Sequence, residues 1–221
     1  MLKGMSDASR LDTAQVDTVQ ETPQIEPAIP KVNPVVYQAV LNVTAFPVFL
    51  SGRRVDVHGL ENIPVAGTPL VIASNHQNWM DPFIIARVFP RGRFIQFMAK
   101  KELFFFGSGH IIRAGGSFPV DRKGNDVGAI RTAMRILKNN GTVGIFPEGR
   151  RTEGLSQLHG GVALIAAKGR APILPVGLSC DDQRWIVRFG EPISPRGGIK
   201  AMTTELAERL KDLSHPVGYK I

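Results

Sequence analysis

Cysteine is almost absent from this chain of 221 residues, whose single thiol belongs to Cys180. One cysteine excludes an internal disulfide and any zinc site built from clustered cysteines. It is consistent with a reducing compartment, where thiols stay unpaired. We do not expect residues 1–33 to be a secretory signal, because they lack a basic start followed by an apolar block.

Several common enzyme motifs are missing too. The sequence has no G-x-S-x-G elbow, no Walker loop, no dinucleotide-binding fingerprint and no pair of histidines at metal-binding spacing. We therefore expect no metal and no organic cofactor. What remains is an ordinary globular composition, with 43% hydrophobic and 21% charged residues, enough for one domain with its own core.

Acidic residues are outnumbered by basic ones, 19 against 27, which gives a net charge of +8. The surplus is uneven, because residues 1–33 carry a net of −2 and the remainder, with 24 basic and 14 acidic residues, carries +10. A basic body favours an anionic partner, namely nucleic acid, anionic lipid or a phosphorylated substrate. The alternative is that the surplus charge only keeps the protein soluble.

Three segments follow one another along the chain. Residues 1–33, rich in Thr, Gln, Asp and Pro, predict a disordered tail. Residues 34–54 predict an apolar membrane-associating segment, because the uncharged stretch 34–50 is too short to span a bilayer but suits a helix at the interface, anchored by Tyr37. A buried core helix is the alternative. Residues 55–221 predict the folded domain.

Strands and helices alternate in this domain, which predicts an α/β fold: a single domain with a mostly parallel or mixed central sheet flanked by helices. Apolar runs predict the strands, and apolar stripes with capping signals such as Asp126 predict the helices. The expected strands are 55–57, 69–74, 94–98, 117–120, 142–146, 173–178 and 185–189, and the expected helices are 82–89, 126–139, 161–168 and 204–213.

The first candidate site follows the strand that ends at Ser74. His76 comes at the carboxyl end of that strand, where open α/β sheets bind their ligands. An imidazole there can take a proton from a hydroxyl, and a carboxylate such as Asp81 can fix its tautomer. The alternative is that His76 is an ordinary loop histidine and Asp81 is only the N-cap of the helix that starts at Pro82.

Two further turns carry groups suited to phosphate. One follows the strand ending at Phe146 and contains Glu148, Gly149 and Arg151; the other ends in Asp121 and Arg122. Guanidinium groups bind phosphate as bidentate donors, and a glycine allows close backbone approach. The alternatives are a solvated surface turn and a surface ion pair between Asp121 and Arg122.

Taken together, these blocks resemble the glycerolipid acyltransferases, specifically the 1-acylglycerol-3-phosphate acyltransferase family. That family carries Asn-His-x4-Asp, then a glycine-led block ending in Arg, then Phe-Pro-Glu-Gly-x-Arg-Ser/Thr, then an apolar strand with proline. Here the blocks occur in that order at residues 75–81, 116–122, 146–152 and 171–177. The resemblance covers about residues 55–190 and implies a glycerol-3-phosphate acyltransferase-like fold.

The resemblance also implies roles for individual residues. His76 would be the general base and Asp81 its orienting partner. Arg122, Glu148, Gly149 and Arg151 would bind the acceptor. Position 150 departs from the family, which often has Thr where this chain has Arg.

The implied reaction transfers a fatty acyl group from acyl-CoA or acyl carrier protein to lysophosphatidic acid. It gives phosphatidic acid for phospholipid biosynthesis. The expected partners are a lysophospholipid acceptor, the acyl thioester and a membrane surface, with peripheral or monotopic attachment at the cytoplasmic face and no nucleic acid. Acylation of another lysolipid, such as lyso-ornithine lipid, and non-catalytic binding of anionic lipid are the alternatives.

One basic stretch supports the membrane expectation. Residues 82–101 hold five Lys or Arg and no acid, interleaved with phenylalanines. This mixture suits an anionic lipid surface. The alternative is a helix and a strand that bury their apolar sides and expose their cations.

Overall fold

The computed structural model describes residues 29–50, 52–105, 107, 109–121, 126–148, 158, 160–180 and 184–214. Its centre is a seven-stranded sheet in the order β1-β7-β6-β2-β5-β3-β4. The strands are β1 (Arg54–His58), β2 (Leu70–Ser74), β3 (Ile95–Lys100), β4 (Phe118–Val120), β5 (Thr142–Ile145), β6 (Ile173–Cys180) and β7 (Arg184–Phe189).

The sheet is mixed. β2 pairs in parallel with β5 and β6, and β3 pairs in parallel with β5 and β4. Among the seven strands of the described residues, β6 and β7 pair antiparallel, and β1 then lies parallel to β7. The carboxyl ends of β2, β5, β3 and β4 therefore meet at one edge. The predicted α/β fold is confirmed, and of the two predicted kinds of sheet, mostly parallel or mixed, the mixed one is found.

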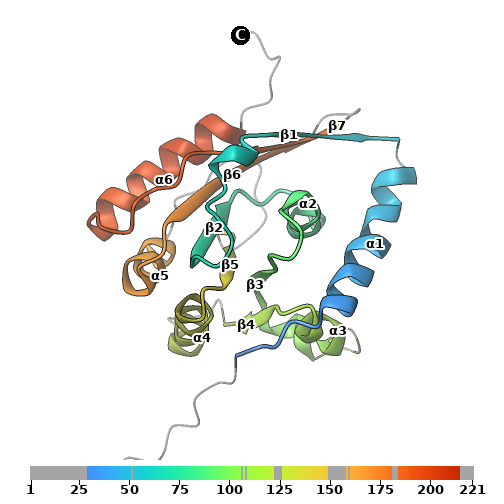
Figure 1. The fold of residues 1–221 in the computed structure, drawn as a ribbon, viewed down its shortest axis with the longest axis horizontal. Helices are drawn as coiled ribbons and strands as arrows, with labels where there is room; N and C mark the ends of the chain where they lie inside the picture. The colour runs from blue at the N-terminus through green and yellow to red at the C-terminus, as the bar shows by residue number, and fades with distance from the viewer. Residues whose placement is uncertain are drawn as a thin grey trace, which may run out of the picture.

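Helices cover both faces of this sheet (Figure 1). α4, α5 and α6 lie on one side, and α1 and α2 on the other. The helices are α1 (Pro34–Leu50), α2 (Asp81–Val88), α3 (Gly109–Ala114), α4 (Val127–Lys138), α5 (Gly161–Gly169) and α6 (Ile199–Ser214), with short 3-10 turns η1 (Leu60–Asn62) and η2 (Lys101–Phe104). The sequence did not predict α3, and it placed the start of α6 at residue 204.

The central strand β2 shows how the two faces are filled. All its residues are buried, and they alternate between two hydrophobic clusters because successive side chains of a strand point to opposite faces. Val71 and Ala73 pack in the cluster under α4, α5 and α6. Leu70 and Ile72 pack in the cluster that contains α2 and Leu41 of α1.

Close helix packing explains one glycine of β6. A Cβ atom at Gly177 would lie 2.3 Å from the backbone carbonyl carbon of Leu213, at the end of α6. Any side chain there would force α6 away from the sheet, because that contact is with backbone and cannot move aside cheaply.

The last residues of the predicted tail are part of the folded body. The Gln96 side chain donates to the Pro30 carbonyl at 2.9 Å, and the Asn33 N–H donates to the Ala114 carbonyl at 2.8 Å. Asn33 also starts α1, since its Oδ1 accepts from Val35 N–H. Residues 1–28 lie outside the described residues.

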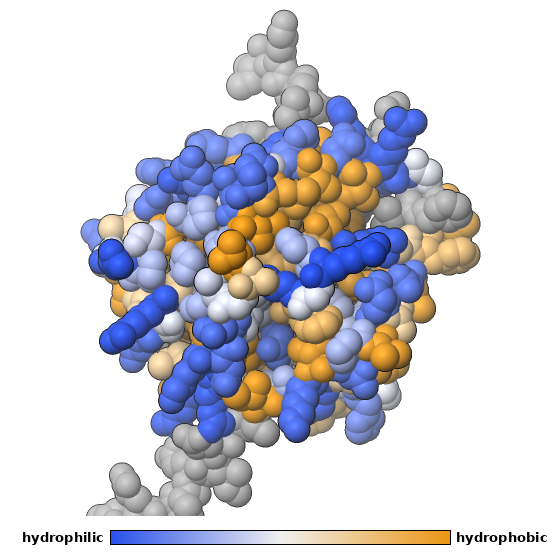
Figure 2. All heavy atoms as spheres, in the orientation of Figure 1, coloured by the Kyte–Doolittle hydropathy of each residue, from blue (hydrophilic) through white to orange (hydrophobic). Residues whose placement is uncertain are grey.

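α1 is a helix, as predicted, but Tyr37 does not face outward. Its hydroxyl accepts a hydrogen bond from Ile95 N–H at 3.2 Å, and its ring meets Phe94 edge-on. Tyr37 therefore holds the helix to the body rather than anchoring it at an interface. Hydrophobic side chains are exposed along another side of α1, namely Val35, Val43, Phe46 and Leu50. Hydrophobic atoms also reach the surface on the side where α1 lies (Figure 2).

In the part of the chain that the structure describes, no helix is both long and apolar enough to cross a bilayer. The basic segment 82–101 is buried in part, while several of its cations stay exposed. Phe89 and Phe97 are buried, and the Arg93 guanidinium donates to Thr142 Oγ1 and to the carbonyl of Thr68. For these side chains the lipid-facing interpretation is wrong, because their apolar groups fill the interior and Arg93 ties loops together.

Candidate active site

The structure brings His76 and Asp81 together at the carboxyl end of β2. His76 Nδ1 lies 2.9 Å from Asp81 Oδ2. The Asp81 side chain is fully buried, and 13% of the His76 side chain is exposed. The Asp81 carboxylate is thus closed to solvent, whereas the His76 imidazole is partly open to it.

Asp81 organises the turn before it rather than the helix after it. Its Oδ2 also accepts from the backbone N–H groups of Gln77, at 2.7 Å, and Asn78, at 2.8 Å. Asp81 is the first residue of α2, and the preceding cap residue, Met80, makes no side-chain capping bond. The alternative that Asp81 only caps the helix is therefore wrong: its carboxylate points back into the turn.

This geometry sets the chemistry available to the ring. An ionised carboxylate can only accept, so the bond requires the proton on His76 Nδ1. The neutral ring then keeps a lone pair on Nε2. A histidine in this arrangement can accept a proton at Nε2, and the buried carboxylate can stabilise the resulting cation.

A phenylalanine fixes the face of the same ring. The rings of His76 and Phe146 are stacked, with 4.1 Å between centroids and 22° between planes. Phe97 stacks in turn on Phe146, at 5.7 Å and 9°. The sequence did not predict that either phenylalanine contacts His76, although Phe146 opens one family block and Phe97 lies in the basic stretch 82–101. Phe146 directly follows β5, and β5 pairs with β2, the strand that precedes His76. The position of Phe146 just after a predicted strand was the one sequence feature that pointed to this contact.

The second predicted turn lies at the same sheet edge. β5 is the parallel neighbour of β2, so Glu148, three residues past its end, emerges close to the His76 turn in the sheet. Glu148 is buried, with 5% of its surface exposed. The predicted acceptor residues Arg122, Gly149 and Arg151 lie outside the described residues.

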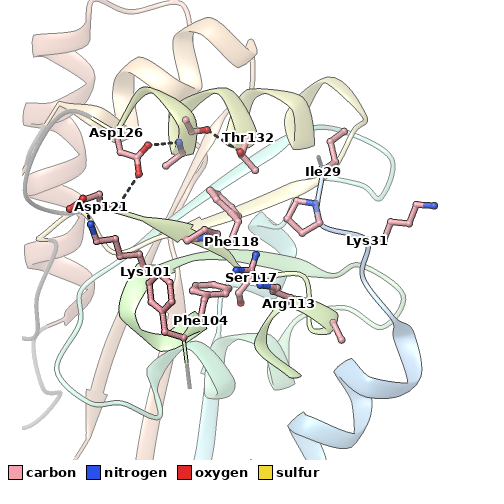
Figure 3. Close-up of a pocket in the computed structure, with 16 residues that line it drawn as sticks. Ile29, Lys31, Lys101, Phe104, Arg113, Ser117, Phe118, Asp121, Asp126 and Thr132 are labelled. Atoms are coloured by element: carbon pink, nitrogen blue, oxygen red, sulfur yellow. Dashed lines mark hydrogen bonds and ion pairs between the residues drawn. The ribbon is translucent and has the colours of Figure 1, made fainter. Parts of the chain in front are cut away.

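A cavity of about 730 Å³ lies two strands beyond β5, next to β4. Figure 3 shows it between α4, which carries Thr132 and is capped by Asp126, and the segments that carry Phe104 and Arg113. Its lining includes Asp121, the residue before Arg122, but neither His76 nor Asp81. The cavity is therefore lined by the residue that precedes the predicted Arg122 and not by the histidine.

Ion pairing orders the mouth of this cavity. Lys101, at the end of β3, forms an ion pair with Asp121, at the end of β4. The hydrogen bond to Asp121 raises the pKa of the exposed Lys101 amine. Asp126 accepts from Asp121 N–H at 2.7 Å and caps α4 by accepting from Ala129 N–H at 2.9 Å. Asp121 is thus held on both sides.

Comparison with known proteins decides the family. The model of the acyltransferase family matches residues 54–179. The chain belongs to the acyltransferase family. The match includes the His76–Asp81 turn and both predicted phosphate-binding turns, so this acyltransferase carries the family's blocks on the strands described above.

Named relatives support the same conclusion. This acyltransferase is 34% identical over 192 residues to the 1-acyl-sn-glycerol-3-phosphate acyltransferase of Bacillus subtilis, which covers 77% of this chain and 94% of the relative. It is 33% identical over 160 residues to the enzyme of that name from Streptococcus pneumoniae, covering 67% of this chain and 58% of the relative.

A solved structure shares the fold. The crystal structure of the 1-acyl-sn-glycerophosphate (LPA) acyltransferase PlsC from Thermotoga maritima superposes with a TM-score of 0.68 at 24% identity, covering 83% of this chain and 81% of that one. Among the described residues, no group of His, Cys, Asp and Glu is arranged to hold a metal ion.

Proposed function

We propose that this acyltransferase moves an acyl group from a thioester to the free hydroxyl of lysophosphatidic acid, giving phosphatidic acid. The observation that carries the proposal is the contact of His76 Nδ1 with the buried Asp81 carboxylate. The identity of the acceptor is taken from the two bacterial relatives, which are both 1-acyl-sn-glycerol-3-phosphate acyltransferases.

The transfer is direct. The acceptor hydroxyl gives its proton to His76 Nε2 as its oxygen attacks the thioester carbonyl carbon, and a C–O bond forms. Asp81 stabilises the imidazolium that results. The tetrahedral intermediate then collapses, the C–S bond breaks, and the imidazolium returns the proton to the departing thiolate. The donor is acyl-CoA or acyl carrier protein, and we expect the reaction to need neither metal nor cofactor.

The acceptor's phosphate would be bound beyond the histidine by Arg122 and Arg151, with Glu148 and Gly149 completing the site. Support comes from position: Glu148 follows β5, and Asp121, which precedes Arg122, lines the cavity of about 730 Å³. Guanidinium groups bind a terminal phosphate as bidentate donors, which favours an acceptor with an exposed phosphate over lyso-ornithine lipid.

α1 would bring the site to its lipid substrate at a membrane surface. The helix has no charged residue, and its exposed side chains Val43, Phe46 and Leu50 recur at helical spacing on one side. An apolar stripe on a surface helix binds the boundary between headgroups and acyl chains. We propose peripheral attachment through this stripe, at the cytoplasmic face where the acyl thioesters are made.

The decisive experiment offers the purified protein lysophosphatidic acid in liposomes with acyl-CoA and acyl carrier protein thioesters in parallel. Lyso-ornithine lipid and a lysophospholipid with a headgroup are the competing acceptors. His76→Ala tests the base, and His58→Ala is the matched control because His58 is an exposed histidine on β1.

We expect phosphatidic acid from the wild type and from His58→Ala, and none from His76→Ala. Preference for another lysolipid would reject the proposed acceptor but keep the chemistry. Full activity in a folded His76→Ala protein would reject the base.

A further inference from the structure

Asn75 is the residue before His76. Its side chain makes two hydrogen bonds to the backbone of a strand far away in the sequence. Its Nδ2 donates to the Leu178 carbonyl at 2.8 Å, and its Oδ1 accepts from Leu178 N–H at 2.7 Å. Only 2% of its surface is exposed. A side chain that satisfies both groups of one buried residue is a fixed point in the fold.

The position of this contact is informative. β2 pairs with β6 up to Ser74, which faces Val176. After Ser74 the chain leaves the sheet to form the catalytic turn, and β6 continues. The carboxamide of Asn75 has one donor and one acceptor side, like a peptide group, so it continues the pairing at Leu178 while its own backbone turns away.

The catalytic turn is therefore held at two ends. Asn75 fixes its start to β6, and Asp81 fixes its end by accepting from Gln77 and Asn78 N–H. His76 lies between the two fixed points, one residue from the first. Its ring can meet both Asp81 and Phe146 only if its backbone is held in register with them.

We propose that Asn75 is a positioning residue for acyl transfer: its carboxamide, bonded to both backbone groups of Leu178, sets the backbone of His76 and so the contact of His76 with Asp81. This inference rests on the proposed role of His76 as base. Asn75 needs no contact with either substrate to act in this way.

The residue type follows from the contact. Alanine would leave the Leu178 N–H and carbonyl buried without partners, which is unfavourable. Aspartate would keep the acceptor but bring a carboxylate oxygen against the Leu178 carbonyl. Serine has one hydroxyl and cannot reach both groups with the same geometry. Asparagine alone among side chains of this length presents a donor and an acceptor side by side.

The test compares Asn75→Ala and the near-isosteric Asn75→Asp with a matched control, Asn62→Ala. Asn62 also ties a turn to a distant strand, donating to the Phe189 carbonyl at 2.9 Å, but it is the last residue of η1 and its partner lies on β7, two strands from β2 in the sheet. We would measure kcat and KM, the melting temperature, and the low-field proton resonance of the His76 Nδ1–H group.

We expect kcat to fall about 10-fold to 100-fold in both Asn75 variants with KM for the acceptor nearly unchanged, because a small misplacement of a catalytic group has effects of that size. The Nδ1–H resonance should shift or broaden. Asn62→Ala should keep kcat within about twofold of the wild-type value. This should hold even if its melting temperature falls as far as that of the Asn75 variants.

Either Asn75 variant with wild-type kcat and an unchanged resonance would overturn the inference and leave Asn75 a purely structural residue. Asn75→Asp covers the case in which Asn75→Ala does not fold. If His76→Ala itself keeps full activity, the proposed base has failed instead, and that result is distinct from an Asn75 variant that behaves like wild type.

Discussion

The rings of His76 and Phe146 are stacked at 4.1 Å between centroids, in the turns after two neighbouring parallel strands. His76 Nδ1 is bonded to Asp81 at the ring edge, so the stack and the carboxylate together leave the imidazole one orientation. The family's first and third sequence blocks therefore meet through an aromatic contact, and that contact can be tested.

We predict that Phe146→Leu lowers kcat about twofold to tenfold, because an aromatic pair contributes about 0.5–1.5 kcal/mol beyond its buried area. Phe146→Tyr keeps the ring and should stay close to the wild-type rate. Steady-state kinetics at saturating donor would check this. Equal losses in the two variants would show that ring stacking is not what matters.

Substitution of Asp81 should lower kcat more than substitution of Phe146. Asp81→Asn keeps the size of the side chain and removes the charge that stabilises the imidazolium, so we expect kcat to fall by about three to four orders of magnitude, as in other His–Asp pairs. Asp56→Asn is the control, because Asp56 is a partly exposed aspartate paired with Arg184 on the outer strands. A loss of similar size in both would point to a general effect of charge.

Gly144 is required by the aromatic stack. A Cβ atom there would lie 2.4 Å from the Phe97 ring, which stacks on Phe146. We predict that Gly144→Ala lowers the free energy of unfolding by about 1–3 kcal/mol, as overpacking a core does. Denaturant unfolding would measure it. Adding Phe97→Leu should recover part of the loss, and no recovery would argue that the clash lies elsewhere.

Burial raises the pKa of the Tyr37 hydroxyl above its usual value near 10. Above that value the unfolded chain loses a proton that the folded protein keeps. The contribution of Tyr37 to the free energy of unfolding is therefore complete below about pH 10 and declines as the pH rises through the pKa of the folded protein. An ultraviolet titration should show a late tyrosinate step that Tyr37→Phe removes. A Tyr37 that titrates no later than a free tyrosine would contradict its packing.

The exposed stripe on α1 predicts membrane binding. Phe46→Glu should weaken sedimentation with anionic vesicles by about tenfold to 100-fold, since burying a phenylalanine contributes about 1.5–3 kcal/mol. Gln38→Glu adds the same charge at an exposed polar position of the helix and should have a smaller effect. If both variants bind vesicles like the wild type, the stripe is not the contact.

Local patterns were enough to predict most strands, the capped helix at Asp126 and the pairing of His76 with Asp81. These features depend on alternation, capping or spacing within a few residues. The pairing of the strands could not be predicted in the same way. The sequence left open whether the sheet is mostly parallel or mixed, and the antiparallel pairing of β6 with β7 shows that it is mixed.

The contacts that hold the site were missed for a different reason. Asn75 and Leu178 are 103 positions apart, and nothing in the composition of either segment indicates the other. The interior role of Arg93 was hidden in the same way, because its partners are carbonyls and a threonine hydroxyl on other segments. The residue types show which chemical groups are present, but only the three-dimensional fold shows which of them are in contact.

The pairing of β1 with β7 has a consequence for how the molecule is made. The first strand of the domain finds its neighbour only in the last, and Arg184 reaches Asp56 across 128 positions of the chain. Such long-range pairing slows folding. While the ribosome is still synthesising β7, β1 has no partner strand, although α1 has already emerged. The apolar helix can therefore meet a lipid surface before the sheet is complete.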